Sequence, residues 1–231
     1  MLQEVQHRPG TQDEHVFREI FAQNCYRIPY KLQKADVVID VGAHIGCFSL
    51  NCLLRGAGKV HAYEPDRENR RYLEQNTSGY LGMHVHPEAI WRSDRHEALT
   101  FTGYPGAMNA CGTCLPECDV GGHNDKVPVR SIGLDRAISR AGGKVRILKL
   151  DCEGAEFPAL YTSKRLYDVD VIVGECHEIP DLGLALHITG FADYTMDELA
   201  NYLDKRWDYR VDAIQQPAQG VPATFLFWAR R

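Results

Sequence analysis

A glycine-bearing turn is the first place where this sequence could bind a ligand. Residues 40–46, DVGAHIG, follow a short β-branched segment and open an apolar one, so they should join a strand to a helix. Glycine lets the backbone turn sharply and approach a ligand, and a helix N-terminus leaves amide hydrogens for an anionic group. Glu64 follows about 20 residues later, at the expected end of the next strand, where its carboxylate can accept hydrogen bonds from ribose hydroxyls.

The turn and Glu64 together fit two kinds of ligand, a nicotinamide dinucleotide or S-adenosylmethionine. A pyrophosphate site normally has the pattern G-x-G-x-x-G, whose middle glycine makes room for phosphate. His44 stands in this turn where that motif prefers a small residue. The spacing therefore favours S-adenosylmethionine, with its methionine carboxylate near the turn and its ribose at Glu64.

An apolar strand that ends in carboxylates is the second candidate element. Residues 147–156, ILKLDCEGAE, should adjoin the strand at 36–41, at the switch point where ligands bind in doubly wound sheets. Carboxylates gathered at one strand end repel one another when water is excluded, so burial without a function is disfavoured. This cluster extends the prediction from binding to methyl transfer.

Four side chains at two strand ends are candidate catalytic groups. Asp151 and Glu153 are best placed to accept a proton from the methyl acceptor, with Glu175 and His177 as alternates. Two structural roles stay open: Asp151 as an acceptor of loop amides, and His177 as an ordinary surface or core histidine. The three carboxylates would also suit Mg²⁺, but we predict a site without a metal.

Cysteines are concentrated in an aperiodic stretch. Cys111-x-x-Cys114-x-x-x-Cys118, with His123 beyond, could supply four zinc ligands. Structural zinc sites more often contain two close cysteine pairs, and this stretch contains one. We therefore expect free thiols in an active-site loop rather than a zinc site.

Strand and helix patterns alternate along most of the chain. Strands are predicted at 36–41, 59–63, 83–86, 97–101, 127–130, 145–150, 169–173, 209–214 and 224–228. Helices are predicted at 14–25, 45–55, 66–76, 134–140, 157–161 and 196–205. This alternation predicts a doubly wound α/β fold with a mostly parallel sheet, and the final strand pair predicts an antiparallel strand at its edge. We expect a single domain over residues 1–231, with a helical lead-in at 1–35 and an active-site loop at 103–126.

Four motifs in order, VIDVGAHIGCFSL, AYEPD, LKLDCEGAE and VGECH, give the sequence a family resemblance. It resembles the FkbM-type S-adenosylmethionine-dependent methyltransferases over roughly residues 17–173 and beyond. The cysteine-bearing loop departs from the family, and the C-terminal part does not align clearly with it. The resemblance implies a class I methyltransferase (Rossmann-like) fold and O-methylation of natural products, sugars or lipids. It also places cofactor-binding residues around the methionine, ribose and adenine. With our own candidates, the cofactor set is Asp40, Gly42, Ala43, His44, Gly46, Glu64, Glu88, Ala89, Ile90 and Asp151.

Aromatic and loop residues are the candidates for binding the methyl acceptor. Tyr26 and Tyr30 follow the lead-in helix and would either cover the acceptor or serve as ordinary packing aromatics. Tyr104, Met108 and Asn109 would line the acceptor pocket. We predict methylation of a small-molecule hydroxyl in natural-product biosynthesis. The alternatives are N-methylation of an aminosugar-type acceptor, a nicotinamide-dependent oxidoreductase, and a catalytically silent binding module.

Composition limits the partners and the location. The chain has 231 residues and a formal net charge of −5, and it has no basic stripe, so a nucleic-acid substrate is disfavoured. It has neither a signal-peptide pattern at its start nor an apolar run of about 18 residues. We therefore expect a cytoplasmic protein that binds no membrane. The oligomeric state stays open, a homodimer included.

Overall fold

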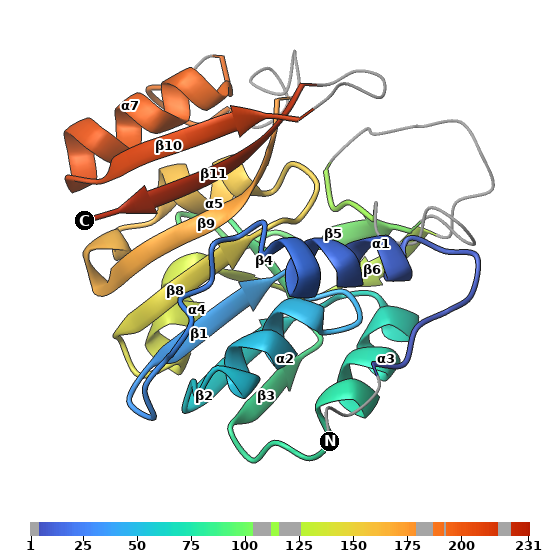
Figure 1. The fold of residues 1–231 in the computed structure, drawn as a ribbon. Helices are drawn as coiled ribbons and strands as arrows, with labels where there is room; N and C mark the ends of the chain where they lie inside the picture. The colour runs from blue at the N-terminus through green and yellow to red at the C-terminus, as the bar shows by residue number, and fades with distance from the viewer. Residues whose placement is uncertain (1–4, 104–111, 116–125, 179–186, 192, 217–222) are drawn as a thin grey trace.

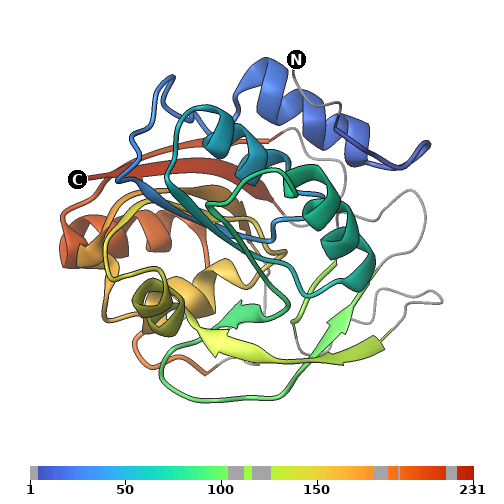
Figure 2. The same cartoon turned by 90° about the horizontal axis from the view of Figure 1, so that it is seen from below.

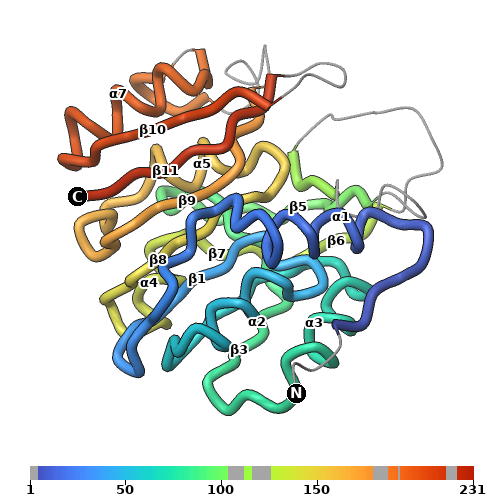
Figure 3. Tube along the Cα trace, viewed as in Figure 1, coloured from blue at the N-terminus to red at the C-terminus, as the bar shows by residue number. Residues whose placement is uncertain are grey.

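A seven-stranded sheet forms the centre of the molecule (Figure 1). The computed structural model describes residues 5–103, 112–115, 126–178, 187–191, 193–216 and 223–231. The strand order across the sheet is β10-β11-β9-β8-β1-β2-β3, and the tube in Figure 3 lets it be followed. The strands are β1 (Val37–Val41), β2 (Lys59–Tyr63), β3 (Met83–His86), β8 (Val145–Leu150), β9 (Val169–His177), β10 (Arg210–Gln215) and β11 (Thr224–Arg230).

Strand direction confirms the predicted class of sheet and changes one detail. β3, β2, β1, β8 and β9 pair in parallel, whereas β11 runs antiparallel to both of its neighbours, β9 and β10. The antiparallel strand is therefore one place in from the edge, which is formed by β10. Burial explains the order, because Phe227, Trp228 and Ala229 of β11 are buried while β10 is almost wholly exposed. The more apolar strand of the final pair lies inside the sheet.

Helices cover both faces of the sheet, as Figure 2 shows. On one side lie α1 (Asp13–Phe17), the π-helix η1 (Arg18–Gln23), α2 (Cys47–Leu54) and α3 (Arg67–Thr77). On the other lie α4 (Leu134–Arg140), α5 (Glu156–Thr162), the 3₁₀ turn η3 (Leu166–Asp168) and α7 (Met196–Trp207). Neighbouring residues of β1 point to opposite faces of the sheet and so belong to two different hydrophobic cores. Val38 packs with η1 and α2, and Ile39 packs with α4 and α5.

Two short ribbons flank the sheet. β4 (Ala89–Trp91) pairs in parallel with β7 (Ser131–Gly133), and β5 (Leu99–Thr102) pairs antiparallel with β6 (Lys126–Val129). The sequence predicted β5 and β6 but not β4 or β7, because three-residue strands are too short for an alternating pattern. Within the described residues, no helix is both long and apolar enough to cross a bilayer.

Candidate active site

A cavity of about 700 Å³ opens at the carboxyl ends of β1, β8 and β9. The register places Val41 of β1 beside Leu150 of β8, and Leu150 beside Gly174 of β9. After β1 the chain continues to one side of the sheet, through β2 and β3, and β8 and β9 lie on the other side. The cavity thus lies where the winding of the sheet reverses, so residues distant in sequence meet around it.

The glycine turn after β1 forms one end of the cavity. Gly42 has φ +71, and a Cβ there would lie 1.8 Å from the carbonyl oxygen of Asp151. The amides of Gly42 and Ala43 both donate to the carbonyl oxygen of Tyr63, at 3.0 and 3.1 Å. Gly42, Ala43 and His44 line the cavity. Only glycine fits at position 42, because a side chain would require both a left-handed backbone and displacement of β8.

Glu64, after β2, is buried beside this turn and also lines the cavity. One carboxylate oxygen accepts a hydrogen bond from the His44 amide at 2.7 Å, and the other accepts one from the Asp66 amide at 2.9 Å. Burial raises the pKa of Glu64 to about 7, although these two amides favour the ionised form. Each oxygen retains a further lone pair that can accept from a hydroxyl group.

Three predicted cofactor residues are not among the described residues that line the cavity: Asp40, Gly46 and Glu88. Asp40 accepts a hydrogen bond from the Ser49 hydroxyl at 2.6 Å, below the turn. Glu88 forms an ion pair with Arg140 at 3.1 Å, because its side chain points toward α4. Gly46, with φ +88, caps α2. The residues after Glu88 that do line the cavity are Ala89 and Ile90.

Asp151, at the end of β8, lies between a buried lysine and a tyrosine. Lys149 Nζ is 3.5 Å from Asp151 and 3.3 Å from Asp40. The Tyr26 hydroxyl donates to Asp151 at 2.8 Å. Burial would raise the pKa of Asp151, but the charges of Lys149 and His177 outweigh it and hold the pKa below its usual value. Asp151 is therefore ionised at neutral pH.

Lys149 is a cavity-lining residue that sequence reasoning missed. It is 3% exposed, and besides the two aspartates it donates to the carbonyl oxygens of Val41 and Gly42. Burial opposes its charge, but the two carboxylates raise its pKa above the usual value. The available signal was a single lysine inside an apolar strand, since a buried cation requires an anionic partner.

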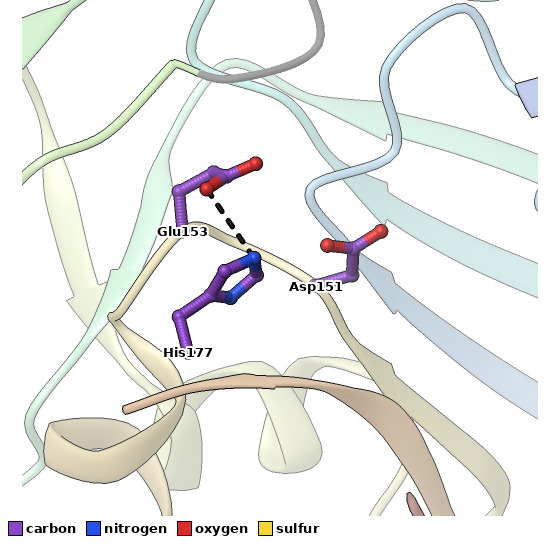
Figure 4. Close-up of side chains that lie close together, drawn as sticks. All are labelled: Asp151, Glu153 and His177. Atoms are coloured by element: carbon purple, nitrogen blue, oxygen red, sulfur yellow. Dashed lines mark ion pairs between the residues drawn. The ribbon is translucent and has the colours of Figure 1, made fainter. Parts of the chain in front are cut away.

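A carboxylate–imidazole cluster, consisting of Glu153, Glu156, Glu175 and His177, lies at the other end of the cavity. Glu153, Glu175 and His177 line the cavity, and Glu156 is buried beneath them. Figure 4 shows Glu153 and His177 together with Asp151. His177 Nε2 lies 3.3 Å from Glu153 and 3.8 Å from Glu175, and Nδ1 lies 3.6 Å from Glu156. Burial disfavours the charged imidazole, but the three carboxylates raise its pKa well above the usual value. Burial is the main reason why the pKa of Glu153 rises to about 7 and that of Glu175 to about 8.

Backbone contacts hold two members of this cluster in place. Glu153 adopts φ +55, an uncommon conformation for a residue with a side chain, and its carbonyl oxygen accepts from the Thr113 hydroxyl at 2.7 Å. Glu156 is fully buried and accepts from the amides of Cys152 and Gly154 at 2.7 and 2.9 Å. The DCEGAE segment thus folds into a tight loop that directs Glu153 toward the cavity and Glu156 beneath it.

The residues predicted to bind the methyl acceptor lie in different places relative to the cavity. Tyr26 lines the cavity through its contact with Asp151, whereas Tyr30 is 96% exposed and is not among the described lining residues. The Tyr30 side chain points into solvent, with the Arg55 guanidinium 5.7 Å from the centre of its ring, so the structure gives no support for its predicted role. Tyr104, Met108 and Asn109 lie outside the described residues, as do Cys111, Cys118 and His123.

Potential metal ligands differ from those the sequence suggested. Cys114 lines the cavity, but burial raises the pKa of its thiol to about 12, so it is un-ionised. Ligand atoms of Asp151, Glu153 and His177 all lie within 4.8 Å of one another. The sequence had suggested Glu175 as the third member of such a set, and the structure favours the histidine.

A sheet of this order, with one antiparallel strand beside its edge and a cavity at its switch point, is the fold of class I S-adenosylmethionine-dependent methyltransferases. The fold class predicted from the sequence is therefore confirmed. The chain belongs to the FkbM methyltransferase family, since residues 40–211 match the family model described as "Methyltransferase FkbM domain". Family membership confirms the resemblance and the enzyme class, and it does not support a nicotinamide-dependent oxidoreductase.

Two curated relatives and one solved structure are similar to the chain. The AMB antimetabolite synthetase AmbE of Pseudomonas aeruginosa is 37% identical over 119 residues, 51% of this chain and 6% of the synthetase. The 31-O-demethyl-FK506 methyltransferase FkbM of Streptomyces tacrolimicus is 27% identical over 179 residues, covering 66% of this chain and 69% of that enzyme. The crystal structure of methyltransferase FkbM from Methylobacillus flagellatus KT superposes with a TM-score of 0.51 at 16% identity, over 85% of this chain and 44% of that one. The chain therefore spans only a small part of the synthetase it matches.

Proposed function

We propose that this chain transfers the methyl group of S-adenosylmethionine to a hydroxyl group of a small molecule of natural-product or sugar type. The observation that carries the proposal is one continuous cavity, with the glycine turn and Glu64 at one end and the carboxylate–imidazole cluster at the other. Its volume of about 700 Å³ is within the usual range for small-molecule sites. The family membership and the similarity to an enzyme named as a 31-O-demethyl-FK506 methyltransferase support the proposal.

The first end of the cavity is assigned to the cofactor. The backbone of Gly42 and Ala43 would lie along the methionine part, and Glu64 would accept hydrogen bonds from the ribose hydroxyls. The apolar Ala89 and Ile90 would flank the adenine. Ionised Asp151, fixed by Lys149 and Tyr26, would face the cationic end of the cofactor. S-adenosylmethionine supplies the electrophilic methyl group when it is bound.

Glu175 is assigned as the proton acceptor. The acceptor oxygen would form a bond to the methyl carbon while the carbon–sulfur bond breaks and its electron pair stays on sulfur. The hydroxyl proton would pass to the Glu175 carboxylate, which lines the cavity and whose pKa of about 8 is close to a neutral working pH. Glu153 and His177 would hold the acceptor beside it.

Negative charge around the cavity favours a second candidate, methyl transfer to an amine. Glu19 of η1 lines the same cavity as Asp151, Glu153 and Glu175. Lys149, the lysine among the described lining residues, is already bound to Asp40 and Asp151. Such a site would attract a cationic amino group, such as that of an aminosugar.

Methyl transfer can be tested with isotopically labelled S-adenosylmethionine and a panel of hydroxylated and aminated metabolites, with products identified by mass spectrometry. We expect labelled product from a hydroxylated member of the panel. Glu175→Gln should lower turnover at least tenfold while S-adenosylhomocysteine still raises the melting temperature. Failure of S-adenosylhomocysteine to bind the wild type would refute the proposal. Product from amines alone would replace it with the second candidate.

A further inference from the structure

We propose that Asp151, Glu153 and His177 bind a divalent first-row transition-metal ion, of which Mn²⁺ is the representative. These residues come from the ends of β8 and β9 and the loop between β8 and α5, and all three line the cavity. The ion would lie at the acceptor end of the cavity. The site itself is inferred from the ligand geometry, but its role in holding the acceptor rests on the proposed function.

The spacing of the ligand atoms is the first observation. One ligand atom from each residue lies within 4.8 Å of the others, and Glu153 Oε2 is 3.3 Å from His177 Nε2. Metal–ligand bonds of roughly 2.0–2.2 Å place adjacent ligands about 3 Å apart and opposite ligands about 4 Å apart. The three side chains therefore need little movement to surround an ion.

The surroundings of His177 are the second observation. The residue is 9% exposed, and its Nδ1 has no hydrogen-bond partner within the described part of the chain. The carboxylates near Nε2 lie at 3.3 and 3.8 Å, beyond the roughly 2.7–2.9 Å of a charge-assisted hydrogen bond. In Figure 4 the ring faces the space between Glu153 and Asp151. Nε2, the ring nitrogen that faces this space, thus has no partner at the distance of a charge-assisted hydrogen bond, and a ligand bound there would supply one.

Glu156 completes the arrangement behind the imidazole. Its carboxylate lies 3.6 Å from His177 Nδ1, on the side of the ring away from Glu153, and two backbone amides hold it there. Metal-binding histidines commonly have a carboxylate at the second nitrogen, which fixes the ring orientation. Carboxylate, imidazole and ion would thus lie in a line.

The donor set indicates which ions fit and what they would do. Two carboxylates would supply negative charge to the ion, although Asp151 shares its charge with Lys149, and an imidazole favours Mn²⁺ or a later first-row ion over Mg²⁺. Three protein ligands leave coordination positions open. An acceptor with two neighbouring oxygen atoms could fill them, and coordination would lower the pKa of its hydroxyl group and ease proton loss to Glu175.

The site can be tested by titrating the full chain with Mn²⁺ in the presence of S-adenosylhomocysteine and following free Mn²⁺ by electron paramagnetic resonance. We expect Glu153→Gln and His177→Gln to weaken Mn²⁺ binding at least about 30-fold. Asp170→Asn, which removes an exposed carboxylate from the far end of β9, should stay within twofold of the wild type. Glu175→Gln, which removes a second carboxyl group from the same cavity, should stay within fivefold.

Three outcomes would overturn the site: no Mn²⁺ binding by the wild type, unchanged binding by His177→Gln, or equal losses in Glu153→Gln and Glu175→Gln. The last would mean that Mn²⁺ responds only to the negative charge of the cavity. The thermal shift with S-adenosylhomocysteine verifies that each variant is folded. It also separates the two proposals, because loss of S-adenosylhomocysteine binding in the wild type refutes the function, whereas loss of Mn²⁺ binding alone refutes the metal site.

Discussion

The two ends of the cavity are built from different kinds of contact. At the glycine turn, the Glu64 carboxylate accepts two backbone hydrogen bonds of 2.7 and 2.9 Å. At the carboxylate–imidazole cluster, His177 faces three carboxylates at 3.3 to 3.8 Å. Backbone amides bind both oxygens of the carboxylate that faces the cavity at the first end, whereas at the second end the cavity-lining groups face one another as charged side chains. Asp151 joins the ends, with its carbonyl oxygen against Gly42 and its carboxylate beside Lys149 and Tyr26.

The difference matches the two tasks of the proposed function. Binding one invariant cofactor is served by groups already in position, because little conformational entropy is then lost on binding. Holding and deprotonating an acceptor requires side chains whose charge changes near neutral pH, and Glu153 and Glu175 have pKa values of about 7 and 8. Four substitutions test this comparison.

The largest effect on stability is expected for Gly42→Ala, which would push the two ends of the cavity apart. A Cβ at position 42 meets the Asp151 carbonyl oxygen at 1.8 Å, so we expect more than about 4 kcal/mol loss in the free energy of unfolding. Gly10→Ala is the matched control, since Gly10 has a similar φ of +74 but open space around it. It should cost about 1–2 kcal/mol. If urea unfolding gave equal losses of free energy of unfolding for Gly42→Ala and Gly10→Ala, the close approach of Gly42 to Asp151 would not be the cause.

Lys149→Met removes the buried cation that links Asp40 to Asp151. Leaving the buried Asp40 and the half-buried Asp151 without a cationic partner should reduce the free energy of unfolding by about 3–5 kcal/mol. Lys144→Met is the control, because Lys144 is exposed and pairs only at the surface. Its effect should be within about 0.5 kcal/mol. A stable Lys149→Met variant would contradict the role assigned to this cation.

Glu64→Gln tests the pH dependence of the glycine-turn end. The pKa of Glu64 is raised from 4.5 to about 7 by burial, so the folded state binds a proton more tightly than the unfolded state. Its contribution to stability is therefore full below pH 4.5 and is lost as the pH rises to about 7. Between pH 5 and pH 8, wild type should lose about 2 kcal/mol more than Glu64→Gln in urea unfolding. Parallel pH profiles would contradict this prediction.

Tyr26→Phe should have the smallest effect. Removing its hydrogen bond to ionised Asp151 should lower the free energy of unfolding by about 1.5 kcal/mol. Turnover with an identified acceptor should fall about tenfold, while S-adenosylhomocysteine binding changes little. Tyr30→Phe is the control, because Tyr30 is 96% exposed, and it should change neither quantity. The comparison of the two tyrosines would fail if both variants behaved alike.

Local patterns predicted most of the fold. The bounds of β2, β8 and α4 coincide with the predicted segments, because each has a clear apolar pattern and a clear end. β4 and β7 were missed, and β9 extends to His177, beyond the predicted end at residue 173. Polar residues at the end of β9 interrupt its apolar pattern, so the predicted strand ended too early. A residue that belongs to a site breaks the apolar pattern of its own strand.

The sequence by itself determined the order of strands and helices, the glycine turn, and the acidic residues that follow β8, because these depend on residues close together in the chain. Only the tertiary structure decided which side chains meet. It paired Glu88 with Arg140 rather than with the cavity, and it placed Lys149 between two aspartates. It also brought His177 to Glu153 and left Tyr30 in solvent. Such choices depend on strand register and on burial across the sheet, which no local pattern records.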